Sequence, residues 1–280
     1  MDHQEGFLKG VRDANIYYQR WLPEGESKAI LLIVHGLAEH SGRYMNVVNH
    51  LVPLGYAVYG LDHLGHGRSD GARTYVEHFE DFANTLKRYF DMVRGWHPDA
   101  PIFLLGHSMG GLISAAYLLD HQAELAGAVL SAPSVQVPDS TSSTTIVISK
   151  VLAAWLPRFG VMQLEAAGVS RDPAVVQAYL SDPLTYTGRI TARMAAELLK
   201  TMQRVTAEAT KITLPIMLVQ GSQDRLVNPD GARILYNTVN SADKTIKIYD
   251  GLYHEVLNEP EHPQVLGDVA AWLEAHLGSP

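Results

Sequence analysis

The chain of 280 residues contains no cysteine, few basic residues and no long apolar run. The absence of cysteine excludes disulfide bonds and cysteine–zinc sites. The 22 lysines and arginines are outnumbered by 30 aspartates and glutamates, so the formal net charge is -8. This balance argues against binding to nucleic acid and against electrostatic attachment to anionic lipid. No apolar stretch approaches the ~18 residues that a transmembrane helix requires.

The first residues also lack the basic and apolar segments of a signal peptide, so we expect none. We therefore expect a cytoplasmic protein, or one attached to the periphery of a membrane. The hydrophobic fraction of 46% and the charged fraction of 19% are typical of a globular protein. The length allows one large α/β domain with an inserted subdomain.

Strand and helix signals alternate over much of the chain. A continuous apolar run such as 29–34 suits a strand that is buried on both faces of a sheet. The alternation predicts a mostly parallel central sheet flanked by helices. The predicted strands are 7–11, 16–21, 29–34, 57–61, 102–105, 127–131, 216–220 and 245–249, and the predicted helices are 43–54, 81–96, 111–120, 230–239 and 263–277.

The composition changes after residue 133, where a stretch rich in Ser, Thr and Pro begins. Apolar and helical pieces follow, broken by proline and glycine, and strand signals return only at Ile216. We therefore predict three segments, with 1–136 and 206–280 forming the α/β core and 137–205 forming an inserted helical cap.

The five residues from Gly106 to Gly110, GHSMG, follow an apolar strand and precede a helix. A serine at such a corner between small residues is a nucleophile elbow. The strained turn exposes the Ser108 hydroxyl, and the glycines allow the neighbouring chain to pass close to it. We predict that Ser108 is a catalytic nucleophile.

A serine nucleophile needs a histidine base, and the base needs an acid that fixes its tautomer. In this architecture the acid and then the histidine follow late strands. Asp224 follows the strand 216–220, and His254 follows the strand 245–249, so we predict both as members of the triad. Asp250 is an alternative acid, but it lies too close to His254 along the chain to approach the imidazole from the side.

An ester hydrolase also needs N–H donors for the oxyanion of its intermediate. We predict the backbone N–H groups of Met109, which follows the nucleophile, and of Leu37, which lies in the loop after the strand 29–34. We predict no cofactor and no metal. The histidine pairs 63/66 and 35/40 lie in loops without a cluster of further ligands, and Gly65-x-Gly67 lacks the third glycine of a dinucleotide fingerprint.

The chain resembles the monoacylglycerol lipase family of α/β-hydrolases over nearly its whole length. The resemblance is carried by HGLAEHSGRY (35–44), DHLGHGRSDG (62–71), FLLGHSMGG (103–111), SDPL (181–184), QGSQDRLV (220–227) and KTIKIYDGLYHE (244–255). It implies an α/β-hydrolase fold and hydrolysis of monoacylglycerols to glycerol and a fatty acid, with the triad and oxyanion donors named above. It also implies a polar glycerol end formed by Glu39, Arg43 and Tyr179. A structural ion pair between Glu39 and Arg43 that braces the oxyanion loop is an alternative, and both roles can hold together.

The cap begins with an apolar segment that is too short to span a bilayer. We predict that its residues form the acyl entrance and touch a membrane or micelle, although a helix packed against its neighbours fits the same pattern. With so few basic residues, we expect this contact to be hydrophobic rather than electrostatic. The residues are Ile146, Val147, Val151, Leu152, Trp155 and Leu156.

The sequence therefore predicts a serine hydrolase of monoacylglycerols. Within enzymes, a broad carboxylesterase or a lysophospholipase is the alternative. From another class, the alternative is a catalytically silent α/β-hydrolase fold that serves as a binding module, although this chain keeps all three triad candidates in order.

Overall fold

The computed structural model describes residues 1–136 and 152–278. Its main feature is an eight-stranded sheet in the order β1-β2-β4-β3-β5-β6-β9-β10. All pairs from β4 to β10 are parallel, while β2 is antiparallel to both of its neighbours. The strands are β1 Asp2–Lys9, β2 Asn15–Leu22, β3 Ala29–Val34, β4 Tyr56–Leu61, β5 Ile102–His107, β6 Gly127–Ser131, β9 Ile216–Gly221 and β10 Lys244–Tyr249.

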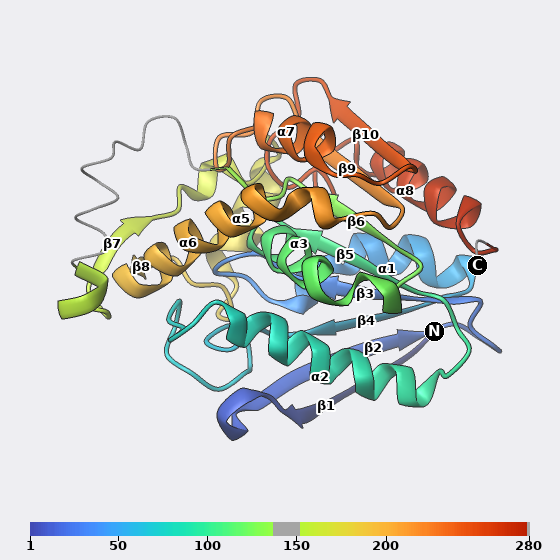
Figure 1. The fold of residues 1–280 in the computed structure, drawn as a ribbon, viewed down its shortest axis with the longest axis horizontal. Helices are drawn as coiled ribbons and strands as arrows, with labels where there is room; N and C mark the ends of the chain where they lie inside the picture. Colours follow the sequence, from blue (N-terminus) through green and yellow to red (C-terminus); the bar gives the residue numbers. More distant parts are fainter. Residues whose placement is uncertain (137–151, 279–280) are drawn as a thin grey trace.

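Helices cover both faces of this sheet (Figure 1). The helices with bounds within the described residues are α1 Met45–Leu51, α2 Glu80–Trp96, α3 Met109–His121, α5 Pro173–Ser181, α6 Ala192–Glu208, α7 Asp230–Thr238 and α8 His262–Ala275, and residues 152–155 are helical too. Short 3-10 turns are η1 Val11–Asp13, η2 Ser41–Tyr44, η3 Val52–Leu54, η4 Gln122–Glu124, η5 Ala166–Gly168 and η6 Ala209–Lys211.

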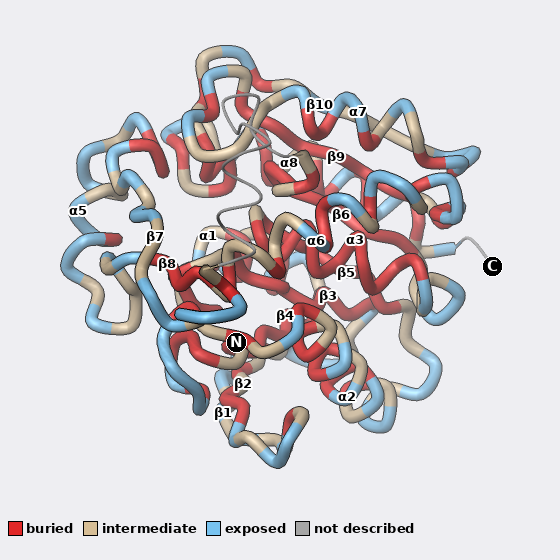
Figure 2. The backbone as a smooth tube through the Cα atoms, turned by 60° about the vertical axis from the view of Figure 1, so that its left-hand side comes forward, coloured by how far each residue is buried: buried red, intermediate tan, exposed pale blue. Residues whose placement is uncertain are grey.

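The central strands are apolar throughout because each one faces two cores. In β3, Ile30 and Leu32 pack into the core beneath α2, α3 and α6, whereas Leu31 and Ile33 pack into the core beneath α1 and α8. All six residues of β3 are buried. Figure 2 shows the buried residues running through the central strands. The parallel α/β architecture predicted from the alternation of elements is confirmed.

Two local predictions were wrong in detail. The predicted helix 43–54 is divided into η2, α1 and η3, and Pro53 lies in the first turn of η3. The first strand begins at Asp2 rather than Phe7, because its polar residues continue the pairing with β2 as far as Leu22. An exposed edge strand needs no apolar run, so its start carried no signal.

The segment predicted as a cap contains a two-stranded ladder as well as helices in its described part. β7 (Gly160–Gln163) pairs antiparallel with β8 (Arg189–Thr191), and neither strand was predicted. β8 runs directly into α6, whose first turn is capped by the Thr191 side chain accepting from Met194 N at 3.3 Å. The predicted cap boundary at 205 falls inside α6, where Met202 and Val205 already belong to the core cluster of α3.

Candidate active site

The elbow lies between β5 and α3, with Ser108 at the turn. Ser108 has φ 55° and ψ -118°, a backbone conformation that residues other than glycine rarely adopt. A Cβ on Gly110 would stand 1.8 Å from the Val34 oxygen, and one on Gly106 would stand 2.4 Å from Ser114 Oγ. Only glycine fits at either flank, so tight packing on both sides holds the serine in its strained turn.

His254 and Asp224 are brought together by the loops after β10 and β9. His254 Nδ1 lies 2.7 Å from Asp224 Oδ2. Gln220 Nε2 also donates to Oδ2 at 2.9 Å, while the backbone N–H groups of Leu226 and Val227 donate to Oδ1 at 2.8 and 3.0 Å. The carboxylate is therefore fixed by four donors and directed at one nitrogen of the ring.

The two groups change each other's pKa. Burial lowers the pKa of His254, but the charge and hydrogen bond of Asp224 outweigh it and leave that pKa raised above 6.5. Burial raises the pKa of Asp224, yet His254 and the two backbone donors bring it below its ordinary value. The pair is thus arranged to stabilise an imidazolium with a carboxylate beside it.

Asp250, the alternative acid, lies elsewhere. Its carboxylate is exposed and accepts a hydrogen bond from Ser222 Oγ at 3.0 Å. The structure therefore brings Asp224 to the imidazole, and Asp250 belongs to a surface turn.

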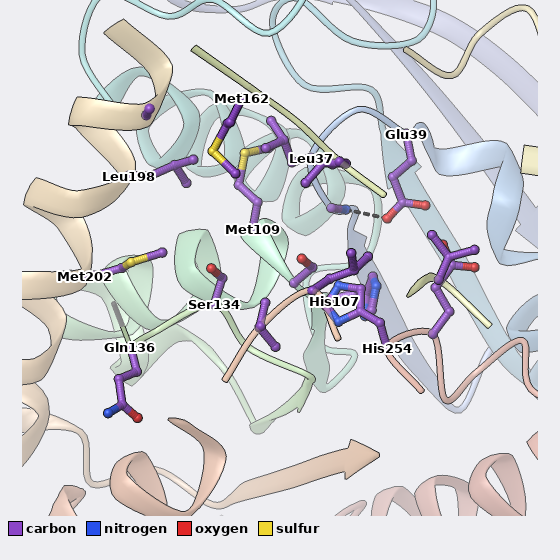
Figure 3. Close-up of a pocket in the computed structure, with 18 of the residues that line it drawn as sticks. Leu37, Glu39, His107, Met109, Ser134, Gln136, Met162, Leu198, Met202 and His254 are labelled. Atoms are coloured by element: carbon purple, nitrogen blue, oxygen red, sulfur yellow. Dashed lines mark hydrogen bonds between the residues drawn. The ribbon is translucent and has the colours of Figure 1, made fainter. Parts of the chain in front are cut away.

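Ser108 and His254 open into one cavity of about 290 Å³. Figure 3 shows Met109, Met162, Leu198 and Met202 together on one side of this cavity, with Glu39 and His254 on the other. The cavity therefore has an apolar side and a polar side. Its lining residues are Gly36, Leu37, Glu39, Arg43, His107, Ser108, Met109, Ser134, Gln136, Val161, Met162, Leu164, Val169, Tyr179, Ala195, Leu198, Leu199, Met202, Leu226, Val227, His254 and Glu255.

The loop after β3 lies against the nucleophile. A Cβ on Gly36 would be 3.2 Å from the Ser108 Cβ, and both Leu37 and Met109 line the cavity. Met109 is the first residue of α3, so its N–H is one of the helix's unpaired first donors. Of the two predicted oxyanion donors, Leu37 thus lies in the loop after β3 and Met109 at the start of α3.

His35 and Glu39 fix the orientation of this loop. His35 Nε2 accepts from the His63 backbone N–H at 2.9 Å, so the ring carries its proton on Nδ1, which donates to the Gly36 oxygen at 2.8 Å. That oxygen and the N–H of Leu37 belong to one planar peptide group, so holding the oxygen sets the direction of the N–H. Glu39 Oε1 accepts from the Gly36 N–H at 2.6 Å.

Glu39 and Arg43 form a buried ion pair that also includes Glu255. Arg43 Nη1 lies 3.0 Å from Glu39 Oε2 and 2.7 Å from Glu255 Oε1, while Nη2 lies 2.8 Å from Glu255 Oε2. The Arg43 guanidinium also lies 4.8 Å from the centre of the Tyr179 ring. The ion pair that the alternative for Glu39 and Arg43 predicted is present, and through the Gly36 contact of Glu39 it braces the loop after β3. Glu255 was missed, although its place next to His254 was a signal.

Histidines beside the site are held by protein contacts. His107 Nδ1 lies 3.2 Å from the Ser131 oxygen, and burial lowers the pKa of His107 to about 4. The rings of His35 and His63 are 4.2 Å apart. Within residues 1–136 and 152–278, no group of three His, Cys, Asp or Glu is arranged to hold a metal ion.

The predicted acyl entrance is described only in part. Ile146, Val147 and Val151 lie outside the described residues. Trp155 and Leu156 are 80% and 55% exposed, and neither they nor Leu152 lines the cavity.

Other cap residues line the cavity instead. β7 contributes Val161 and Met162, and α6 contributes one face. The sequence signal was the helical spacing of the α6 residues, namely Ala195, Leu198, Leu199 and Met202. No helix in the described part of the chain has both the length and the apolar character to cross a membrane.

The chain matches a family of known hydrolases over most of its length. The model of the serine aminopeptidase S33 family matches residues 25–261. A monoacylglycerol lipase of Mycolicibacterium smegmatis is 40% identical over 98% of this chain and 98% of its own length. The human monoglyceride lipase is 37% identical over 91% of this chain and 84% of its own. The crystal structure of a Paleococcus ferrophilus monoacylglycerol lipase is 30% identical, covers 93% of this chain and 99% of its own, and has a TM-score of 0.83.

Proposed function

The chain belongs to the serine aminopeptidase S33 family of hydrolases, and from this premise we propose that it is a monoacylglycerol lipase. It cleaves the carboxylic ester of a monoacylglycerol to glycerol and a free fatty acid. The observation that carries the proposal is the cavity shared by Ser108 and His254, which is polar at one end and lined by methionine and leucine at the other. Relatives named monoacylglycerol or monoglyceride lipase, 37–40% identical over nearly the whole chain, support it.

In the proposed reaction, Ser108 Oγ attacks the ester carbonyl while His254 Nε2 takes its proton. Asp224 holds Nδ1 and stabilises the imidazolium that forms. The N–H groups of Leu37 and Met109 receive the oxyanion, and losing one such donor typically costs ~10²–10³ in turnover. His254 then protonates the departing glycerol oxygen and leaves an acyl group on Ser108. Water activated by His254 releases the fatty acid and restores the serine.

The two ends of the substrate are assigned by polarity. The acyl chain lies along the apolar face of α6 and the side chains of β7. The glycerol hydroxyls meet the polar end, where Tyr179, Glu39 and Arg43 line the cavity. Because Glu39 and Arg43 already bond within the protein, the Tyr179 hydroxyl is the group most available to glycerol. No cofactor has a role in this reaction.

The cap supplies the route for a lipid. Its exposed Trp155 and Leu156 form a hydrophobic contact with a membrane or micelle surface, from which a single-chain lipid enters. The protein is then a cytoplasmic enzyme that associates with membranes at their periphery.

The test is the initial rate on monoacylglycerols, with diacylglycerols, triacylglycerols, lysophospholipids and short esters alongside. We expect strong cleavage of monoacylglycerols and poor cleavage of the bulkier lipids, because one acyl chain fills the apolar part. Ser108→Ala should lose turnover and fluorophosphonate labelling, whereas Ser181→Ala, an exposed serine on α5, should keep both.

Three outcomes contradict the proposal. Good cleavage of short esters, with monoacylglycerols no better than diacylglycerols, indicates a general esterase. Faster cleavage of lysophospholipids indicates a lysophospholipase. Failure of the wild-type chain to label indicates a catalytically silent fold.

A further inference from the structure

A second pocket, of about 550 Å³, lies on the cap and is separate from the catalytic cavity. It is formed between the loop at 72–75 and the β7–β8 ladder, which Figure 1 shows at the edge of the molecule away from the C-terminus. Its lining residues are Ala72, Arg73, Tyr75, Arg158, Phe159, Gly160, Tyr186, Arg189 and Thr191. We call this feature the arginine pocket.

The arginine pocket is positively charged in a protein whose net charge is -8. Its lining contains three arginines and no acidic residue. Arg73, Arg158 and Arg189 are exposed, and none of them makes an ion pair with an acidic residue in the described parts of the chain. Such concentrated charge with no counter-ion is complementary to an anion.

The neighbouring acid is already neutralised. Glu77 accepts from the Tyr75 hydroxyl at 2.5 Å and pairs with Arg193 at 3.1 Å. Tyr75 in turn lies under the Arg158 guanidinium, which is 5.1 Å from the ring centre. The aromatic ring therefore positions Arg158 without cancelling its charge.

The arginine pocket has a large apolar side chain in its lining, and two more precede that residue in the chain. Phe159 lines the pocket and is 54% exposed, and Trp155 and Leu156, which precede Phe159 in the sequence, are 80% and 55% exposed. Backbone hydrogen bonds fix this segment, from Phe159 N to the Leu156 oxygen at 2.9 Å and from Ala192 N to the Phe159 oxygen at 2.8 Å. Binding of a dissolved anion would need only the arginines and no exposed apolar side chain. Exposed aromatic side chains beside arginines are the pattern of a surface that meets lipid headgroups and the upper acyl chains together.

We propose that the arginine pocket binds the phosphate groups of anionic phospholipids and thereby docks the cap on a membrane surface. Guanidinium groups suit this role because each donates two parallel hydrogen bonds to a phosphate. The docking is therefore electrostatic as well as hydrophobic, which differs from the expectation drawn from the overall composition. The proposal rests on the cap meeting a lipid surface, and it does not depend on which ester is cleaved.

The position of the pocket links docking to catalysis. β7 contributes Gly160 to the arginine pocket, and its next two residues, Val161 and Met162, line the catalytic cavity. A membrane held at the arginine pocket thus lies beside the strand that borders the acyl site.

The experiment measures binding of the full chain to vesicles of phosphatidylcholine alone or mixed with phosphatidylglycerol. The variant carries Arg73→Gln, Arg158→Gln and Arg189→Gln. The matched control carries Lys200→Gln, Lys211→Gln and Arg233→Gln, whose side chains are 59%, 62% and 57% exposed. Both variants remove three positive charges, so the net charge changes equally. Thermal unfolding and hydrolysis of a soluble short ester show whether each protein is folded and active.

We expect wild type to prefer the anionic vesicles and to lose that preference at high salt. The pocket variant should bind the anionic vesicles at least about tenfold more weakly, while the control stays close to wild type and both keep their activity on the soluble ester. Equal binding to both vesicles, undiminished binding by the pocket variant, or an equal loss in the control overturns the proposal. Titration with inorganic phosphate provides a further arm, because phosphate binding without a preference for anionic vesicles assigns the pocket to a soluble anion instead. Activity on the soluble ester without vesicle binding refutes the docking alone and leaves the proposed function standing.

Discussion

Ser108 holds a backbone conformation that costs of order 1–3 kcal/mol at a non-glycine residue. Tight packing around Ser108 offsets this cost. Gly106 and Gly110 carry no side chain, so the backbones of β5, α3 and the end of β3 can lie in direct contact. At this scale the proposed chemistry depends on single atoms. One hydrogen bond of 2.7 Å selects Asp224 as the partner of His254.

Replacing Asp224 by asparagine should lower kcat on monoacylglycerols by about 10⁴. The amide cannot hold the imidazole in the tautomer whose Nε2 accepts the Ser108 proton. Asp250→Asn is the matched control, since that carboxylate bonds Ser222 and should leave kcat near the wild-type value. If steady-state kinetics show the larger loss for Asp250→Asn, the acid has been assigned to the wrong residue.

Individual site residues differed in how far the sequence revealed them. Ser108 and Asp224 could be predicted because each follows a buried apolar strand, and His254 because it follows the last strand; the ends of parallel strands meet at one edge of the sheet. The bidentate contact of Glu255 with Arg43 joins residues far apart in the chain, and no local pattern encodes such a pairing. Leu198 and Met202 resembled ordinary core positions of an amphipathic helix, because an acyl site and a protein core select the same apolar side chains.

Secondary-structure elements are held in register at the active site by backbone approaches that exclude side chains. A Cβ on Gly110, in the first turn of α3, would stand 1.8 Å from the Val34 oxygen at the end of β3. Neither backbone segment can move without disturbing the sheet. The contact therefore couples the elbow helix to the loop that carries Leu37.

Gly110→Ala should lower the free energy of unfolding by about 3 kcal/mol or more, because the new methyl group meets backbone rather than a flexible side chain. Gly95→Ala is the control, since its added Cβ meets nothing within 4 Å in the exposed part of α2. That substitution should leave the free energy unchanged or raise it by up to about 1 kcal/mol. Urea unfolding of both variants provides the measurement. Equal stability of Gly110→Ala and wild type would show that the backbones of α3 and β3 can move apart at Gly110 with little loss of free energy.

Element prediction succeeded where burial was uniform and failed where it was not. The strands 29–34 and 127–131 were placed to the residue, because both of their faces lie in the core. β7 and β8 have four and three residues, partly exposed, so they show neither an apolar run nor a regular alternation. Their pairing depends on a partner that is distant in sequence.

The described parts of the molecule have two cores on opposite faces of the sheet, and a buried cluster of the charged side chains Glu39, Arg43 and Glu255 lies beside Ser108 and His254. Burial raises the pKa of Glu39, but Arg43 and nearby histidines outweigh it and lower that pKa to about 2. A carboxyl whose folded pKa is depressed contributes stability above its unfolded pKa near 4.5. This contribution is lost as the pH falls from about 4.5 toward 2.

Glu39→Gln should therefore lower the free energy of unfolding by about 2–3 kcal/mol at neutral pH and by about half as much near pH ~3. Urea denaturation at the two pH values provides the comparison. Glu26→Gln, at an exposed glutamate, should change little at either pH. A deficit for Glu39→Gln that is the same at both values would assign the loss to packing rather than to charge.

The net charge of the chain does not predict the charge of each part of its surface. The composition indicates an acidic protein, yet three arginines of the arginine pocket gather from positions 73, 158 and 189. Only the folded chain places these positions together, since one belongs to the core and two to the cap.

The path of α6 has a consequence for building chimeric enzymes. The helix begins at β8 in the cap and ends at Glu208, with Met202 and Val205 seated in the same core cluster as α3. A junction at 205 would join two halves of one helix from different parents and mix their contacts with α3. We therefore expect a chimera to fold best when the predicted cap is exchanged together with all of α6 and η6, with the downstream junction before β9, after Ile212.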